Sequence, residues 1–278
     1  MVPPELKQSI ERNVTAALEE DIGSGDLTAR LVPEGETARA SVMTREPAVL
    51  AGAPWFEAVF HRLDPRVRLS WLRQDGEALQ AGDTICTLEG AARPLLTGER
   101  TALNFLQTLS AVATKTRRYV EAVRGTRAVV VDTRKTLPGL RLAEKYAVRM
   151  GGGRNHRLGL YDGILIKENH IAAAGGIRPA LGAATRLNAE VPMQIEVESL
   201  AQLEEALDAG SKLVLLDNFS LEGLRDAVRM NAGRAELEAS GGISLGGLRA
   251  IAETGVDRIS VGALTKDVKA IDLSMRFG

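Results

Sequence analysis

The chain has 278 residues, of which 45% are hydrophobic, so it can bury a large core in one or two domains. Its 35 basic and 36 acidic residues leave a net charge of −1, which argues against a general nucleic-acid binder or membrane-surface binder. A single cysteine excludes an intrachain disulfide and the N-terminal residues contain no apolar signal segment, so we expect a cytoplasmic protein.

The first part of the chain has an α+β pattern, in which short apolar runs alternate with segments of helical periodicity. In chain order we expect a helix over residues 5–20, a strand over 38–44, a helix over 54–62, strands over 67–72 and 84–88, and a long helix over about 95–124. Leucines of this long helix, at positions 96, 103, 106 and 109, are expected to form its buried stripe.

After Gly125 the pattern changes to repeated strand–helix units. Strands are expected over residues 128–131, 163–166, 193–197, 212–216, 235–239 and 258–261, with helices over 200–208, 221–230 and 245–253. Repeated units of this kind predict a parallel sheet, either open or closed as a barrel, although six strands are fewer than the eight of a complete barrel.

Polar residues or glycines follow each of these strands. Because active sites of α/β barrels lie at the C-terminal ends of the strands, the strand ends predict one composite site. Its candidate residues, from the first strand to the last, are Thr133, Arg134, Lys135, Lys167, Glu196, Asp217, Ser240, Gly241, Gly242, Val261, Gly262 and Ala263.

The segment from Asp132 to Arg157 is rich in Lys and Arg within an otherwise neutral chain. Such a local excess indicates a pocket for a polyanion, because Arg offers a planar fork and Lys a point charge for carboxylates and phosphates. The anion-binding candidates are Arg134, Lys135, His156, Arg157 and Lys167. For most of Arg141, Lys145 and Arg149 we expect the solvated face of a helix over residues 140–150.

Two further features of the strand ends each have two interpretations. The Ser240–Gly242 and Val261–Ala263 segments can cradle a phosphate with backbone N–H groups, or they can be simple turns. Glu196 and Asp217 can hold Mg²⁺ shared with substrate phosphates, or bind ribose hydroxyls, or form ion pairs with the basic cluster. From the residues alone, Arg100 is an exposed ion-pair partner of Glu99.

Longer motifs carry a more specific signal. In this order the chain contains GERTALNFLQTLSAVAT, DTRKTLPGLRLAEKYAVRMGGGRNHRLGLYDGILIKENHI, IEVES, LLDN, EASGGI and VGALT. These segments resemble the quinolinate phosphoribosyltransferase family, and the similarity spans essentially the whole chain.

The resemblance implies an α/β fold in which an N-terminal α/β sandwich domain, residues 1–110, precedes an incomplete six-stranded α/β barrel, residues 111–270. Residues from about 271 to 278 would return to the first domain. It also implies a homodimer in which the sandwich domain of one subunit covers the barrel mouth of the other. The partner's Arg100 would then reach the site.

The implied reaction joins quinolinate to 5-phosphoribosyl 1-diphosphate with Mg²⁺ as cofactor. It releases CO₂ and pyrophosphate and gives nicotinate mononucleotide for de novo NAD biosynthesis. By resemblance, quinolinate would be held by Arg134, His156, Arg157, Lys167 and the partner's Arg100, and Thr133 would be a further substrate-binding residue. The 5-phosphate would be held by Ser240–Gly242 and Val261–Ala263, and the implied catalytic residues are Lys135, Glu196 and Asp217.

Two other functions compete with this interpretation. One is a homologous protein of molybdate-transport operons, which would act on a different acceptor. The other is a non-catalytic phosphosugar-binding protein. The intact Arg134, His156, Arg157 and Lys167 favour quinolinate over the first, and Glu196 and Asp217 argue against the second, since binding alone does not require a positioned Mg²⁺.

Overall fold

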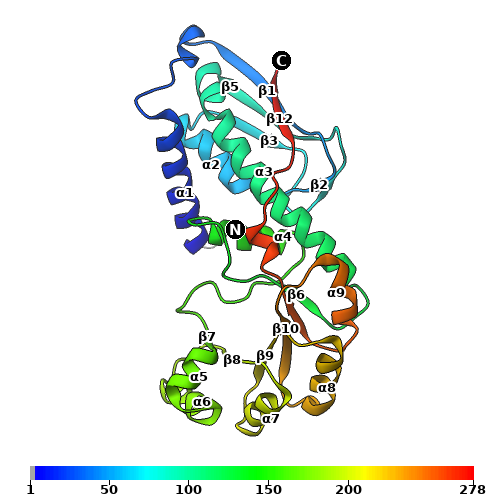
Figure 1. Ribbon diagram of the computed structural model, residues 1–278. Helices are drawn as coiled ribbons and strands as arrows, with labels where there is room; N and C mark the ends of the chain where they lie inside the picture. Colours follow the sequence, from blue (N-terminus) through cyan, green and yellow to red (C-terminus); the bar gives the residue numbers. More distant parts are fainter. Residues whose placement is uncertain (1–3) are drawn as a thin grey trace. The chain divides into compact units, whose positions relative to one another are not determined.

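The computed structural model describes residues 4–278, which form two compact units (Figure 1). The first unit contains the chain up to Arg117 together with Thr136–Gly152 and Leu264–Gly278, and the second contains Arg118–Lys135 and Gly153–Ala263. The domain limits of residues 1–110 and 111–270 stay a prediction. Within residues 4–278, no helix is both long enough and apolar enough to cross a membrane.

The first unit is built on a four-stranded antiparallel sheet with the strand order β12-β1-β5-β3. In Figure 1 the red C-terminal strand β12 runs beside the blue β1. The strands are β1 (Thr37–Thr44), β3 (Arg68–Trp71), β5 (Thr84–Ala91) and β12 (Leu273–Phe277), and β2 (Ala48–Val49) pairs with β4 (Ala78–Leu79) in a separate short ladder.

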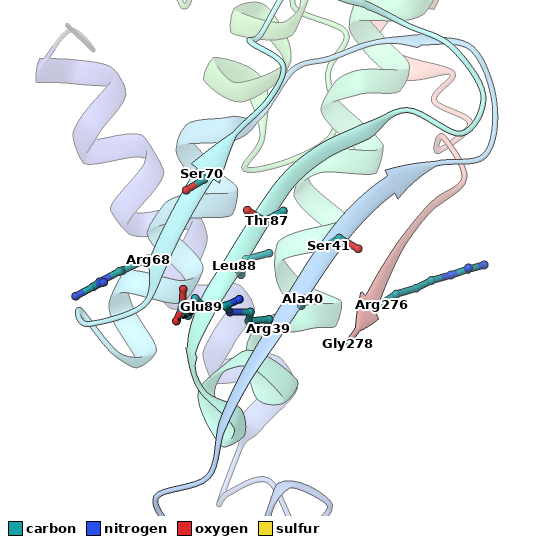
Figure 2. A pocket seen from close by; sticks show the side chains of 10 residues that line it. All are labelled: Arg39, Ala40, Ser41, Arg68, Ser70, Thr87, Leu88, Glu89, Arg276 and Gly278. Carbon is teal, nitrogen blue, oxygen red and sulfur yellow. Dashed lines mark hydrogen bonds and ion pairs between the residues drawn. The ribbon is translucent and has the colours of Figure 1, made fainter.

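One face of this sheet contributes to the core and the other carries polar side chains. Ala40 and Val42 of β1 are buried, whereas the alternate residues Arg39 and Ser41 line a hollow of about 670 Å³ (Figure 2). Arg39 forms an ion pair with Glu89 there at 3.4 Å. This alternation is the usual pattern of an antiparallel sheet with one solvated face. None of the predicted site residues lines this hollow.

The helices of the first unit supply the rest of its core. They are α1 (Pro4–Ile22), the 3₁₀ turn η1 (Ala29–Leu31), α2 (Ala53–Leu63), α3 (Ala92–Ala122), α4 (Arg141–Met150) and the short α10 (Ala263–Lys266), which begins at the last residue of the second unit. In α3, Leu95, Leu103, Leu106 and Leu109 are buried, but Leu96 is 37% exposed, so its place in the predicted stripe was wrong. Leu95 occupies the buried face instead, because α3 repeats every 3.6 residues and its neighbour at 96 points elsewhere.

A solvated face was predicted for most of the three basic residues of α4, and Lys145 is the exception. Arg149 is exposed, but the Lys145 side chain is only 1% exposed and the neighbouring Glu144 is fully buried. The helix buries Ala143, Glu144, Lys145, Ala147 and Val148, a face too broad for Lys145 to reach solvent. Glu144 accepts a hydrogen bond from the backbone N–H of Leu137 at 3.1 Å, which ties the preceding loop to the helix.

The second unit is a six-stranded parallel sheet with the order β6-β11-β10-β9-β8-β7. Its strands are β6 (Val129–Val131), β7 (Ile164–Ile166), β8 (Met193–Val197), β9 (Leu213–Asp217), β10 (Glu236–Ser240) and β11 (Arg258–Ser260). The expected α/β fold, an incomplete six-stranded barrel preceded by a sandwich domain, is confirmed. Its helices are α5 (Glu168–Ala174), α6 (Ile177–Arg186), α7 (Leu200–Asp208), α8 (Leu221–Asn231) and α9 (Leu245–Ala252).

Candidate active site

The C-terminal ends of the parallel strands surround a pocket of about 150 Å³. Eight of the predicted site residues line it: Thr133, Arg134, Lys135, His156, Arg157, Lys167, Glu196 and Ser240. Asp217, Gly241, Gly242, Val261, Gly262 and Ala263 are not among its lining residues, although all belong to the same strand ends. Arg100 lies in α3 of the first unit, so its predicted role in a partner's site stays a prediction.

Two guanidinium groups of this pocket repel each other. Burial lowers the pKa of Arg157 and the nearby charge of Arg134 lowers it further, while Asp162 acts in the opposite direction. Arg157 is oriented by a hydrogen bond from its Nη1 to the carbonyl oxygen of Gly163 at 3.1 Å. Half-buried cations held close together are stabilised by an anion between them, so this geometry suits a ligand with several negative charges.

The loop that carries His156 and Arg157 is anchored by Asp132, a fully buried residue that directly follows β6. The Asp132 carboxylate accepts hydrogen bonds from Asn155 Nδ2 at 2.6 Å and from the backbone N–H of His156 at 2.8 Å. A parallel bridge between Val131 and Arg154 adds the same loop to the edge of β6. Asp132, the first residue of the basic segment, therefore holds the loop in place.

On β8, the Glu196 carboxylate points into the pocket and accepts a hydrogen bond from Lys167 Nζ at 2.8 Å. The predicted ion pairing with the basic cluster therefore occurs at this residue. Burial raises the pKa of Glu196, the Lys167 ammonium lowers it, and the carboxylates of Asp217 and Glu168 raise it again, with a net upward shift. Glu196 and Asp217 thus act on each other as like charges, an arrangement that a bound cation would relieve.

Glycines allow the backbone to approach closely at the last two strand ends. Gly241 has φ +104, and a Cβ atom at this position would clash with the side chain of Asn218 and lie 2.9 Å from its backbone nitrogen. At Gly262, a Cβ would lie 3.1 Å from Lys135 Cδ and 3.5 Å from Thr133 Oγ1. These glycines bring the loops after β9 and β10, and after β6 and β11, into contact around the pocket.

The roles of four residues were not predicted from the sequence. Glu238 and Ser260 line the pocket, and Asp132 and Gln194 form hydrogen bonds with residues around it. A signal for two of them was present. Gln194 stands two residues before Glu196 in an otherwise apolar strand, and Glu238 stands two residues before Ser240. Because side chains at i and i+2 share one face of a strand, a polar residue at that spacing points to the same interior as the site residue.

Comparison with known proteins assigns both halves of the chain. The model of the quinolinate phosphoribosyl transferase N-terminal domain matches residues 26–110, and the model of the C-terminal domain of the same family matches residues 112–276. The chain is 45% identical over 269 residues to the carboxylating nicotinate-nucleotide pyrophosphorylase of Mycobacterium leprae, covering 94% of this chain and 95% of that relative.

Two further proteins show the same similarity. A probable carboxylating nicotinate-nucleotide pyrophosphorylase of Bacillus subtilis is 43% identical over 257 residues, which are 92% of this chain and 89% of the relative. The solved structure of the nicotinate-nucleotide pyrophosphorylase from Francisella tularensis superposes with a TM-score of 0.94 at 44% identity, covering 100% of this chain and 98% of that one.

Proposed function

The chain belongs to the quinolinate phosphoribosyl transferase family, and we propose that it transfers the 5-phosphoribosyl group of 5-phosphoribosyl 1-diphosphate to the ring nitrogen of quinolinate. Pyrophosphate and CO₂ are released, and the product is nicotinate mononucleotide for NAD biosynthesis. The observation that carries the proposal is the strand-end pocket, whose lining combines Arg134, Arg157 and Lys167 with Glu196 and Ser240. Both substrates are polyanions, and such a pocket can hold them together.

Quinolinate binds through its two carboxylates. The guanidinium groups of Arg134 and Arg157 are the donors best suited to this task, because each can form two parallel hydrogen bonds with one carboxylate. The hydrogen bond from Arg157 Nη1 to the carbonyl oxygen of Gly163 limits the directions in which the guanidinium group can point. The clamp therefore fixes the orientation of the pyridine ring, and so of the ring nitrogen that reacts.

The substitution forms a bond between the ring nitrogen and the anomeric carbon of the ribose while the bond from that carbon to the diphosphate oxygen breaks. Positive charge develops on the ribose, and the carboxylates of Glu196 and Asp217 stabilise it. Negative charge develops on the leaving diphosphate, and Lys135 stabilises that charge. No thiol takes part, since Cys86 is buried and burial raises its pKa to about 12.

The resulting pyridinium promotes decarboxylation. The bond between the ring and the C2 carboxylate breaks, its electron pair stays on the ring carbon beside the cationic nitrogen, and a proton then replaces CO₂. The loops at Ser240–Gly242 and Val261–Ala263 hold the 5-phosphate through backbone N–H groups during both steps.

The residues of the site fit a Mg²⁺ ion that is shared with the substrate. Residues 4–278 contain no cluster of three or more His, Cys, Asp or Glu side chains that could hold a metal by themselves. Glu196 and Asp217 supply two like-charged carboxylates that would hold the ion, and diphosphate oxygens and water would supply its other ligands. When bound, the ion would neutralise charge on the leaving group.

We further propose a homodimer with shared sites, to which each subunit contributes its Arg100, and a cytoplasmic location. The location is supported by Cys86, the only cysteine of the chain, which is a buried free thiol. The relatives reported above are all named for the nicotinate-nucleotide reaction, so the alternative acceptor of a molybdate-operon homologue has no support among them.

A product assay tests the proposed function. Purified protein is given quinolinate, 5-phosphoribosyl 1-diphosphate and Mg²⁺, and nicotinate mononucleotide is measured by chromatography. Nicotinate, which lacks the second carboxylate, is the matched control substrate, and excess chelator is the control for Mg²⁺. We expect product from quinolinate with Mg²⁺ alone. Product from nicotinate at an equal rate would contradict recognition of the second carboxylate, and full turnover in chelator would contradict the role of the metal.

A further inference from the structure

The chain between Arg157 and β7 forms a turn whose shape depends on the carboxylate of Asp162. Its Oδ2 atom accepts a hydrogen bond from the backbone N–H of Leu158 at 2.7 Å, and its Oδ1 atom accepts one from the backbone N–H of Gly159 at 2.9 Å. The two donors begin the turn and Asp162 ends it, so the carboxylate closes the turn. The next residue, Gly163, directly precedes β7.

Burial of large apolar side chains does not hold this turn in place. Leu160 is 73% exposed and Tyr161 is 74% exposed, so neither side chain is part of the core. Ordering the backbone of a turn costs conformational entropy, which hydrogen bonds must offset where little apolar surface is buried. Asp162 accepts two such bonds, and removing its carboxylate should therefore loosen the turn.

The end of the turn supports the side chain of Arg157 along its length. Arg157 Nη1 donates its hydrogen bond to the carbonyl oxygen of Gly163 at 3.1 Å. A Cβ atom at Gly163 would lie 3.3 Å from Arg157 Cβ and 3.6 Å from Arg157 Cδ, so the aliphatic part of Arg157 lies against the glycine backbone. Burial and the charge of Arg134 lower the pKa of Arg157, whereas the charge of Asp162 acts to raise it. The turn therefore supplies Arg157 with both a contact and an opposite charge.

Asp162 and Gly163 support Arg157 from outside the strand-end pocket. Arg157 lines that pocket, whereas Asp162 and Gly163 line, together with Arg157, a separate hollow of about 350 Å³. We propose that Asp162 is a positioning residue for the quinolinate clamp. Its carboxylate closes the turn, the turn holds Gly163 against Arg157, and this contact fixes the direction of the guanidinium group. The inference rests on the proposed function, which assigns Arg157 to a quinolinate carboxylate.

Asp162→Asn is the informative variant, because its effects on position and on charge change quinolinate binding in opposite directions. An amide oxygen can accept one of the two backbone N–H bonds, so the turn loses the other bond together with a negative charge. Loss of the charge alone would make the clamp more attractive to an anion and would lower the KM for quinolinate. We expect loss of position to outweigh it, because solvent screens the charge of the half-buried Asp162, whereas a misplaced guanidinium loses a charge-assisted contact. The KM for quinolinate should therefore rise about 3- to 20-fold, while the KM for 5-phosphoribosyl 1-diphosphate changes less than about 2-fold.

Two further variants separate position from charge. Gly163→Ala displaces the side chain of Arg157 without changing any charge, and it should raise the KM for quinolinate about 2- to 10-fold. Asp208→Asn is the matched control, since Asp208 is an exposed carboxylate of the same unit that pairs with Arg234 at 3.1 Å. It should keep both wild-type KM values. A Gly163→Ala variant with the kinetics of this control would overturn the support of Arg157 by the turn.

A double-variant cycle tests whether Asp162 acts through Arg157. Arg157→Lys keeps the positive charge but lacks the planar fork whose direction the turn would fix. In that background Asp162→Asn should change the quinolinate KM less than about 2-fold, because the group that it positions is already absent. A turn that only stabilises the fold would give the same fold-change in both backgrounds, and that result would overturn the inference.

Hydrogen exchange measured by NMR tests the turn independently of activity. The amides of Leu158 and Gly159 should be protected in the wild type and in Asp208→Asn, and at least one of them should exchange about 10-fold faster in Asp162→Asn. Unprotected amides in the wild type would overturn the inference whatever the activity, and so would an unchanged or lowered quinolinate KM in Asp162→Asn. A wild-type protein that does not turn over quinolinate would refute the proposed function, and the exchange rates would still decide whether Asp162 closes the turn.

Discussion

At the scale of single residues, the site is defined by charges that the fold holds in unfavourable surroundings. Burial and Arg134 lower the pKa of Arg157, and burial raises that of Glu196. Each shift means that the charged form is less stable in the folded protein than in water. A polyanion relieves the strain at the guanidinium groups, and a cation relieves it at the carboxylates. Binding of the two substrates with a metal would therefore neutralise both the positive and the negative charges of the site.

Arg157→Ala tests the cationic side of this balance. Loss of a charge-assisted, two-pronged contact should raise the KM for quinolinate about 10- to 100-fold, or remove activity, while the fold survives. Steady-state kinetics measures the effect, and circular dichroism reports on the fold. Arg154→Ala is the matched control, because Arg154 is an exposed arginine of the same loop. Kinetics of Arg157→Ala equal to those of the control would reject the role of Arg157 in binding.

Glu196 predicts a pH dependence of stability with a definite sign. Its pKa in the folded protein lies above the ordinary value of 4.5, so the folded state binds more protons than the unfolded state just above pH 4.5. The free energy of unfolding should therefore fall as pH rises from 4.5 through the raised pKa. Urea unfolding at a series of pH values should show this fall in the wild type.

The variant Glu196→Gln cannot ionise at this position and should lack that part of the fall. Glu198→Gln, at an exposed position two residues further along, should keep the wild-type curve. Parallel curves for the wild type and Glu196→Gln would contradict the raised pKa.

At the scale of elements, the active-site loops depend on backbone conformations that only certain residues adopt. Gly241 has positive φ against Asn218, whose own φ is +57. The two loops thus contact each other through backbone and a short amide side chain. A non-glycine residue held at positive φ, as Asn218 is, is typical of a functional site, where the surrounding structure must impose that conformation.

Gly241→Ala should lower the free energy of unfolding by about 1–3 kcal/mol and raise the KM for 5-phosphoribosyl 1-diphosphate, because a Cβ atom there is strained and displaces Asn218. Gly247→Ala is the control, since Gly247 lies in α9 and a Cβ atom there meets nothing within 4 Å. That change should stabilise the protein by about 0.5–1 kcal/mol. If both variants had wild-type stability and kinetics, the tight contact between the two loops would not matter.

The strands of the second unit could be predicted because they are short apolar runs between turn residues. The prediction for β8 (Met193–Val197) matches the structure at both ends, and α7 (Leu200–Asp208) begins and ends as predicted. Helices α5 and α6 were missed, since the segment around them is rich in Ala and Gly and has few large apolar residues from which to read a period.

The residues that line the pocket could be found from the strand-end rule, but the contacts that support them could not. The spacing of Gln194 and Glu238 places them on the same strand faces as Glu196 and Ser240, but only the structure shows that they are buried and hydrogen-bonded to each other. Lys145 shows the same limit in the other direction, because a basic residue on a helix is usually exposed and here it is not. Sequence patterns give periodicity, whereas burial of a polar group depends on the partners that other elements bring.

At the scale of the whole molecule, the proposed site needs a second copy of the chain. Arg100 belongs to the first unit and the pocket to the second, and we propose that each site combines the pocket of one subunit with Arg100 of its partner. A twofold-symmetric dimer would contain two such sites.

Subunit exchange tests this arrangement. At a quinolinate concentration near the wild-type KM, Arg100→Ala and Arg157→Ala should each have little or no activity alone. Equal mixing should restore up to about a quarter of the wild-type activity, since half of the dimers would be mixed and each would hold one intact site. Mass spectrometry of differently tagged chains verifies the exchange. Proven exchange without recovery of activity would contradict a site built from both subunits.

The most direct test of the central claim is release of labelled CO₂ from quinolinate that carries ¹³C in its C2 carboxylate. We expect that ¹³CO₂ forms only when 5-phosphoribosyl 1-diphosphate and Mg²⁺ are present, and in an amount equal to nicotinate mononucleotide. Release without the phosphoribosyl donor, or product formation with retention of the label, would contradict the claim that transfer to the ring nitrogen promotes the decarboxylation.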